Sequence, residues 1–135
     1  GMPVLDVLQK RGLVDVCIVV TRYFGGILLG GGGLVRAYSH CASIACDSAK
    51  IMNMRSCSRI FLEMDYNLYG KVSYILPNFK TITVNSDFGD NVKLELFVTD
   101  EMTQQLKTEL IDISNGNISI TEAEKLFADF SSINF

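Results

Sequence analysis

The residues whose types and spacing suit chemistry gather in one stretch, at positions 21–38. Six of the eleven glycines of the 135-residue chain fall within positions 25–33, between Arg22 and Arg36. Glycine loses more backbone freedom on folding than any other residue, so this cluster indicates either positive φ angles or close approach by another group. Backbone N–H groups that lead into a helix N-terminus are oriented donors at the positive end of a dipole. The stretch therefore suits an anion.

The predicted anion contacts combine two arginines with aromatic side chains and backbone N–H groups. Arg22 ends an apolar run and Arg36 lies early in the following helix, so both suit a phosphate, whose binding would depend on salt. Tyr23 and Phe24 suit stacking on a base. The predicted nucleic-acid or anion-binding residues are Thr21, Arg22, Tyr23, Phe24, Gly25, Gly26, Gly30, Gly32, Gly33 and Arg36.

Two other interpretations of these residues stay open. In one, Tyr23, Phe24 and Tyr38 form a protein interface. In the other, they are core aromatics, and the glycines only let a helix and a strand pack closely. The spacing matches neither G-x-x-x-x-G-K-S/T nor G-x-G-x-x-G, so binding of a nucleoside triphosphate or a dinucleotide is not supported.

Groups suited to catalysis or metal binding are scarce near the glycines. The chain has one histidine, His40, and only Tyr38, Ser39 and Asp47 accompany it as candidate acids, bases or nucleophiles. His40 could be a general base or a phosphate contact, but we interpret it as an exposed side chain, because no recognisable nucleophile motif and no second metal ligand accompany it. The four cysteines lack C-x-x-C spacing, which favours reduced core thiols, and one histidine excludes a His-rich metal site. No catalytic residue, metal or cofactor is predicted. The cysteines are Cys17, Cys41, Cys46 and Cys57.

Charge divides the chain into two parts. Residues 1–55 carry a net charge of +3 and residues 56–135 a net charge of −6. This asymmetry indicates two units with different partners, of which the first is the better candidate for nucleic acid. No apolar run approaches the roughly 18–20 residues of a membrane span, and no signal-peptide pattern opens the chain. We therefore expect a cytoplasmic protein without membrane partners.

The elements that position the glycines are predicted as helix, strand and helix. A short helix over residues 3–11 has proline in its first turn and Gly12 as its stop signal. Residues 15–22 are apolar on both faces, which predicts a covered central strand. A helix over residues 34–50 follows the glycine-rich loop, with an apolar face of small residues suited to packing on a sheet.

The second part alternates between strands and helices. Strands are predicted over residues 59–64, 81–88, 92–98 and 117–121, and helices over residues 68–76 and from Thr99 or Asp100 to Gly116. The order strand, helix, strand, strand, helix, strand is the ferredoxin-like arrangement. The predicted fold class is α+β, with this second domain at residues 56–130.

One long motif resembles a known family. The sequence Thr21-Arg22-Tyr23-Phe24-Gly25-Gly26-x-x-Leu29-Gly30-x-Gly32-Gly33-Leu34-Val35-Arg36-Ala37-Tyr38 is similar to the signature of the IMPACT family, whose bacterial members are called the YigZ family. The opening Gly1-Met2-Pro3-Val4-Leu5 resembles the segment that precedes this signature. Position 31 varies in the family, so Gly31 is not expected to be functional. The second domain resembles the ferredoxin-like domain that bacterial members append.

The resemblance implies a two-domain protein tied to translation. The first domain, at residues 1–53, would resemble part of a ribosomal-protein α/β sandwich shared with the fourth domain of elongation factor G, and the second would resemble the last domain of that factor. Eukaryotic members regulate a starvation-sensing translational kinase by competing for its activator protein, and nucleic-acid or ribosome binding is the usual inference for bacterial members. The motif implies no catalytic activity.

The resemblance also implies a missing piece. Family members have several further strands before the point where this chain begins, so we expect an N-terminal truncation that leaves about half of the first sheet. An open strand edge is a template for pairing with another chain. We therefore expect some self-association into a homo-oligomer.

The second domain admits an RNA-binding interpretation, because Phe61 and Phe97 suit the open sheet face on which RNA-recognition modules stack bases. Its acidic balance and the absence of a basic, Gly-containing signature favour a protein-docking or auxiliary role instead.

Taken together, the sequence favours a non-catalytic binding protein in translation or its regulation, with RNA, the ribosome or a regulatory protein as partner. The alternatives are an enzyme acting on a small phosphorylated or peptide-like substrate and a pure protein-interaction regulator.

Overall fold

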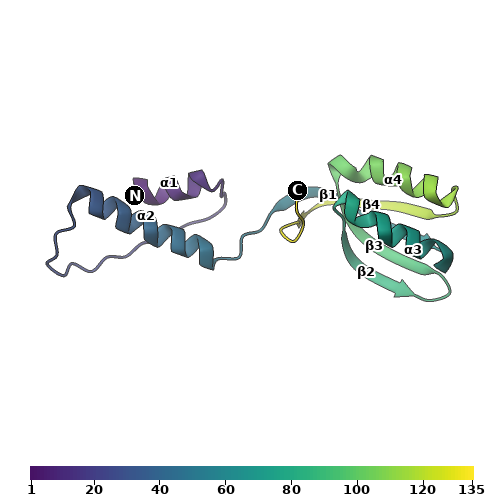
Figure 1. The fold of residues 1–135 in the computed structure, drawn as a ribbon, viewed down its shortest axis with the longest axis horizontal. Helices are drawn as coiled ribbons and strands as arrows, with labels where there is room; N and C mark the ends of the chain where they lie inside the picture. The colour runs from purple at the N-terminus through teal and green to yellow at the C-terminus, as the bar shows by residue number, and fades with distance from the viewer. The chain divides into compact units, whose positions relative to one another are not determined.

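The computed structural model describes residues 1–135 and divides them into two compact units, Gly1–Ile51 and Met52–Phe135 (Figure 1). We call them unit 1 and unit 2 and treat each by itself. Unit 1 contains two helices, and unit 2 contains two helices, a short 3-10 helix and the four strands of one sheet. The expected α+β fold class is confirmed. None of the helices combines the length and the apolar character that crossing a membrane requires.

Unit 1 opens with helix α1, Met2–Lys10, which ends as the sequence predicts. Gly12 has a φ of +66°, a conformation that glycine adopts without strain. Its N–H donates to the carbonyl of Gln9 at 3.1 Å, and the N–H of Leu13 donates to the carbonyl of Leu8 at 3.1 Å. These two bonds form a Schellman motif, which satisfies carbonyls that the helix end would otherwise leave unpaired.

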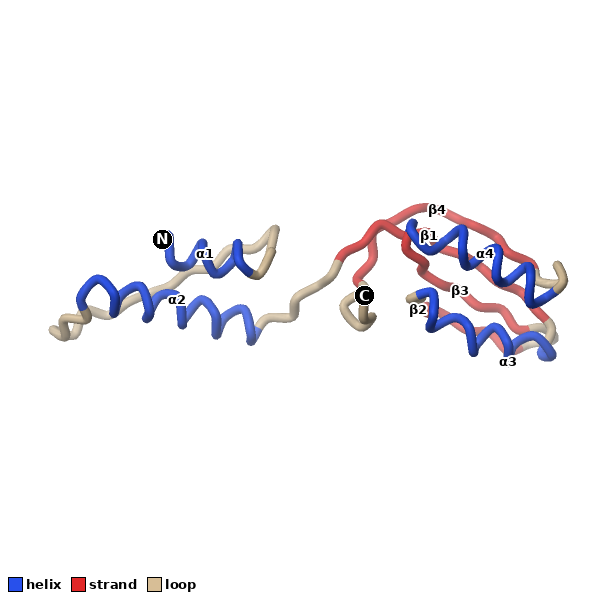
Figure 2. Tube along the Cα trace, turned by 45° about the horizontal axis from the view of Figure 1, so that its top comes forward, coloured by secondary structure: helices blue, strands red, loops and turns tan.

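The predicted central strand at residues 15–22 is wrong. The chain from residue 13 to residue 29 is extended or irregular and belongs to no sheet. Val14 and Val19 are 78% and 83% exposed, so the apolar run is not covered on both faces. A strand needs a hydrogen-bonded neighbour, and no other extended segment of unit 1 supplies one. The segment instead runs alongside the second helix (Figures 1 and 2).

Helix α2, Gly30–Ser48, is the main element of unit 1. It starts four residues before the predicted position and includes the four glycines that we expected in a loop. Only Ala42 and Cys46 of this helix are buried. The core-thiol interpretation is accordingly correct for Cys46 and for Cys57 of unit 2, but wrong for Cys17 and Cys41, which are exposed. Cys17 lies in the extended segment, and Cys41 lies in α2.

Unit 2 has the predicted ferredoxin-like order. Its elements are β1 (Met54–Met64), α3 (Tyr66–Ile75), η1 (Leu76–Phe79), β2 (Ile82–Phe88), β3 (Val92–Thr99), α4 (Asp100–Ser114) and β4 (Ser119–Asp129). The sheet order is β2-β3-β1-β4, and every neighbouring pair is antiparallel. Figure 2 shows α3 and α4 on the same face of this sheet.

The main core lies between the sheet and these two helices. Alternate residues of β1 and β3, among them Ile60 and Leu96, pack against Val72 of α3 and against Leu106 and Leu110 of α4. β1 and β4 are longer than the predicted strands because they pair with each other over most of their length. A β-bulge places one extra residue in β4 opposite Ser58–Ile60 of β1, and the alternation of buried residues in β1 continues past it.

A smaller cluster lies on the opposite face of the sheet, at one end. Phe130 is fully buried there and contacts Cys57 and Ala128. The backbone N–H of Phe130 donates to the carbonyl of Asn53 at 2.8 Å, which ties the residues after β4 to the start of β1. Residues 130–135 therefore cover one end of the face that the helices leave open.

Candidate nucleic-acid interface

The first turn of α2 is a row of exposed backbone donors. It consists of four glycines, Gly30–33, and no side chain caps it or places a carboxylate within it. The N–H groups of a first helical turn have no partner within the helix and carry the positive end of the dipole. Glycine in a helix costs roughly 0.5–1 kcal/mol per residue relative to alanine. A run of four is unfavourable for helix stability, but it removes every Cβ that would keep a ligand away from these donors.

Arg36 folds back over this turn. A Cβ added at Gly32 would lie 3.4 Å from Nη1 of Arg36, so the guanidinium is next to the glycines one turn away. Long helical side chains point toward the helix N-terminus, which explains this direction. Arg36 forms no ion pair with a carboxylate of the chain. Its charge therefore adds to the positive potential at the start of α2.

Gly30 and Gly33 have structural reasons to be glycine. Gly30 has a φ of +71°, which residues other than glycine rarely adopt. A Cβ at Gly33 would lie 3.0 Å from Cβ of Leu29. Gly31 has neither constraint, because its φ is not positive and no atom would meet its Cβ within 4 Å. Backbone and steric constraints therefore explain glycine at positions 30 and 33 but not at position 31.

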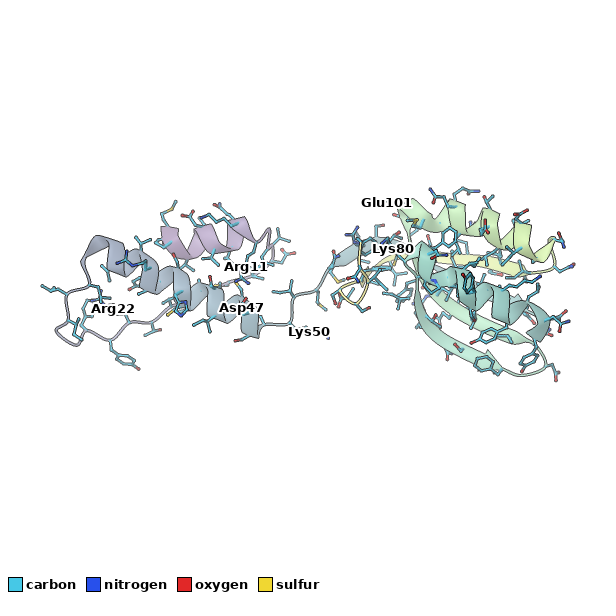
Figure 3. All side chains as sticks on the ribbon, viewed as in Figure 1. Arg11, Arg22, Asp47, Lys50, Lys80 and Glu101 are labelled. Carbon is cyan, nitrogen blue, oxygen red and sulfur yellow. The ribbon has the colours of Figure 1, made fainter.

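Arg22 and Phe24 form a pair in the segment before α2. The guanidinium carbon of Arg22 lies 4.5 Å from the centroid of the Phe24 ring, a cation–π distance. Phe24 and Tyr23 are 86% and 92% exposed. Stacked arginine and exposed aromatic rings are groups on which bases of single-stranded nucleic acid stack. Arg22, like Arg36, has no carboxylate partner; its label in Figure 3 marks its place beside α2.

The whole stretch from residue 16 to residue 46 contains no aspartate or glutamate. The acidic residue that follows, Asp47, is engaged elsewhere, because Nη1 of Arg11 donates to its Oδ1 at 2.9 Å. Figure 3 labels both partners of this ion pair. The positive charges of Arg22 and Arg36 therefore have no acidic neighbour in the surrounding sequence.

A depression of about 430 Å³ lies between the extended segment and α2. It gathers four of the predicted residues, Thr21, Arg22, Tyr23 and Gly25, and Tyr38 from α2. Most of its remaining lining is apolar, from Val20, Ile27, Leu29, Leu34, Ala37 and Cys41. Its volume falls within the range of about 300–1,000 Å³ that is common for small-ligand pockets.

The structure therefore sorts the predicted residues into two groups. Gly30, Gly32, Gly33 and Arg36 make the start of α2, while Thr21, Arg22, Tyr23 and Gly25 line the depression. Phe24 stands beside Arg22, and Gly26, with a φ of +83°, lies in the turn of the connecting loop. No hydrogen bond or ion pair joins the two groups. The helical lining residues at positions 34, 37, 38 and 41 were missed as ligand contacts, although their spacing marks one helix face.

Two family models match the chain. The Impact N-terminal domain matches residues 1–46, and a domain of unknown function, DUF1949, matches residues 62–117. The chain belongs to the IMPACT family. The first model covers the α2 start and the depression of this IMPACT-family chain, and the second covers α3, β2, β3 and α4 of unit 2.

Curated relatives match along most of the IMPACT-family chain. IMPACT family member YvyE of Bacillus subtilis is 33% identical over 129 residues, which are 96% of this chain and 59% of the relative. IMPACT family member YigZ of Escherichia coli is 28% identical over 125 residues, 93% of this chain and 61% of the relative. The Protein IMPACT homolog of Dictyostelium discoideum is 38% identical over 65 residues, which cover 48% and 18% of the two chains. The chain thus spans about three fifths of the length of the two bacterial relatives.

A solved structure described as a crystal structure of a hypothetical protein has the same fold. It superposes with a TM-score of 0.52 at 28% sequence identity, over 92% of this chain and 60% of the other. The likeness supports the α+β architecture of the IMPACT-family chain.

Proposed function

We propose that this chain is a non-catalytic binding protein that contacts RNA phosphates through the first turn of α2 together with Arg22 and Arg36. The observation that carries the proposal is the uncapped glycine turn with Arg36 folded over it, in a stretch that contains no carboxylate. Donors and positive charge then converge where a phosphate can approach the backbone. The exposed ring of Phe24, stacked on Arg22, supplies a platform for a base.

The role in translation or its regulation, with the ribosome as target, rests on family membership and on the motif at residues 21–38. The cytoplasm is the compartment in which this role would be exercised. Catalysis has less support, because His40 is exposed and forms no hydrogen bond or ion pair with another side chain. We propose residues 1–53 and 56–130 as the two domains, with RNA contact in the first and a protein-docking or auxiliary role in the second.

The test is binding of a labelled ribosomal RNA fragment, and of whole ribosomes, over a series of salt concentrations. Each phosphate contact to single-stranded nucleic acid contributes about 0.7 to the slope of log affinity against log salt. Arg22→Gln and Arg36→Gln should each reduce the slope by about that amount. Lys50→Gln is the matched control, because it removes the same charge from unit 1 at an exposed position after α2. Equal losses in all three variants, or no binding by the parent chain, would overturn the proposal.

The depression beside α2 supports a second candidate, a small phosphorylated ligand with a base or other apolar body. Its volume and its apolar lining around Arg22 fit such a molecule. Titration with a nucleoside monophosphate separates the two candidates. Saturable binding that Arg22→Gln abolishes, without any RNA binding by the parent chain, would favour the small ligand.

The exposed apolar segment supports self-association as a further property of unit 1. Val14, Val19 and Leu28 are each more than three quarters exposed. Because unpaired extended chain is a template for β pairing, we propose that this segment pairs with another chain at high concentration. Sedimentation that shows a monomer at every concentration would contradict this expectation.

A further inference from the structure

The helix-free face of the sheet in unit 2 carries an ordered arrangement of side chains that the proposed function does not use. Antiparallel register places them in three neighbouring rows across the strands. The first row contains Phe97 and Arg59, and Glu124 joins it through an ion pair with Arg59. The second row contains Asn85, Glu95, Phe61 and Thr121, and the third contains Asp87, Lys93, Glu63 and Ser119.

Of the cations on this face, Arg59 and Lys93 each have two acidic neighbours, whereas Arg55 lies over the Phe135 ring at the covered end. Arg59 forms ion pairs with Glu95 and with Glu124 and lies over the Phe97 ring at 5.2 Å. Hydrogen bonding to these two carboxylates raises the pKa of Arg59 above its ordinary value. Lys93 stands opposite Glu63 on β1 and opposite Asp87 on β2. Each group of three is therefore one positive charge short of neutrality.

Phe61 lies between the two groups and is open to solvent. It is 42% exposed and lines a depression of about 250 Å³. The polar lining of this depression has three carboxylates and one cation, together with one amide and two hydroxyls, from Glu63, Asp87, Glu95, Lys93, Asn85, Ser119 and Thr121. This volume is below the range of about 300–1,000 Å³ common for small-ligand pockets, and it suits a single side chain better. Residues 130–135 cover only the Phe97 end of the face and leave Phe61 free.

We propose that this face docks an extended segment of a partner protein that carries lysine or arginine at alternate positions. A cation placed over Phe61 would be attracted by the aromatic ring, and two cations at alternate positions would supply the one positive charge that each group lacks. The rows are two residues apart along β1, and alternate residues of an extended peptide share this spacing, because both rise about 3.3 Å per residue. The acidic balance of unit 2 favours the approach of such a segment and disfavours RNA.

The probe for this proposal is a fluorescein-labelled peptide of four Lys-Ala repeats, with a Glu-Ala peptide of the same length as its counterpart. We expect the full chain to bind the first peptide and not the second. Phe61→Ala should weaken binding about fivefold, as loss of one cation–π contact implies. Phe61→Leu should weaken it similarly, because leucine keeps the apolar surface and removes the ring.

Two double variants test whether peptide binding requires the acidic residues of this face. Glu63→Gln combined with Asp87→Asn should weaken binding about tenfold, as two partly exposed ion pairs imply. Glu101→Gln combined with Asp112→Asn is the matched control, because it removes the same charge from exposed positions on α4; Figure 3 labels Glu101. Lys93→Gln should strengthen binding. Circular dichroism establishes that each variant folds.

Three results would overturn the proposal. They are equal effects of the two charge-neutralised pairs, unchanged binding by Phe61→Ala, and binding of ribosomal RNA that Phe61→Ala abolishes. The last would assign the face to bases instead of a basic peptide. Since Arg22 and Arg36 lie in unit 1, their variants report on the proposed phosphate site independently of this test.

Discussion

Replacing Phe130 by alanine tests whether the residues after β4 belong to the folded core of unit 2. Phe130 is fully buried against Cys57, Ala128 and partly buried neighbours that include Phe97. Truncating a buried phenylalanine costs about 3–5 kcal/mol, since both the transfer free energy and a cavity contribute. The ring also meets Phe135 edge-on, with centroids 6.2 Å apart, which adds to the loss.

The expected loss is a large part of the free energy of unfolding of unit 2. Domains of this size have free energies of unfolding of roughly 5–15 kcal/mol, so Phe130→Ala removes about a fifth or more of the stability. With a urea m-value of about 1–3 kcal/mol/M, the unfolding midpoint should fall by about 1–5 M. Far-UV circular dichroism of the full chain follows the transition, because unit 2 holds all the strands and the larger core.

Phe127→Ala is the matched control for this measurement. Phe127 lies three residues earlier, in β4, and is 69% exposed, so the same truncation there should change stability by at most about 0.5 kcal/mol. Equal losses in the two variants, or a loss below about 1 kcal/mol for Phe130→Ala, would refute the inference that residues 130–135 pack on the sheet.

Three further outcomes are expected. Lys107→Ala should lower stability by less than about 1 kcal/mol at neutral pH. The hydrogen bond from Lys107 lowers the pKa of Glu122, so this contribution is present above the unfolded pKa and disappears as the pH falls through the folded value; urea titrations at neutral and acidic pH check it. Disulfide-exchange reagent should label two thiols in the native chain and four after denaturation, because Cys46 and Cys57 are buried and burial also raises the pKa of Cys57. Gly31→Ala should raise helicity, whereas Gly30→Ala should lower it, as circular dichroism would show.

The elements whose signals are local could be predicted from the amino-acid sequence. Gly12 ends α1 because the left-handed conformation there suits glycine, and the alternation of apolar residues in β3 follows directly from one buried face. The ferredoxin-like order in unit 2 could be predicted because each element carries its own period and its own turn or cap residues. The residues of the candidate phosphate site were found in the same way, from a glycine cluster between two arginines.

Features that depend on a neighbour in space could not be predicted in this way and came from the three-dimensional structure. Residues 15–22 have the composition of a buried strand but have no hydrogen-bonded neighbour strand. A strand forms only when two segments pair, so the composition of one segment does not determine it. The position of Arg36 over Gly32, the bulge near Ser58 and the burial of Phe130 likewise come from contacts that no local pattern encodes. Local propensity sets what an element can be, and the free energy of packing against other elements sets where it begins, ends and faces.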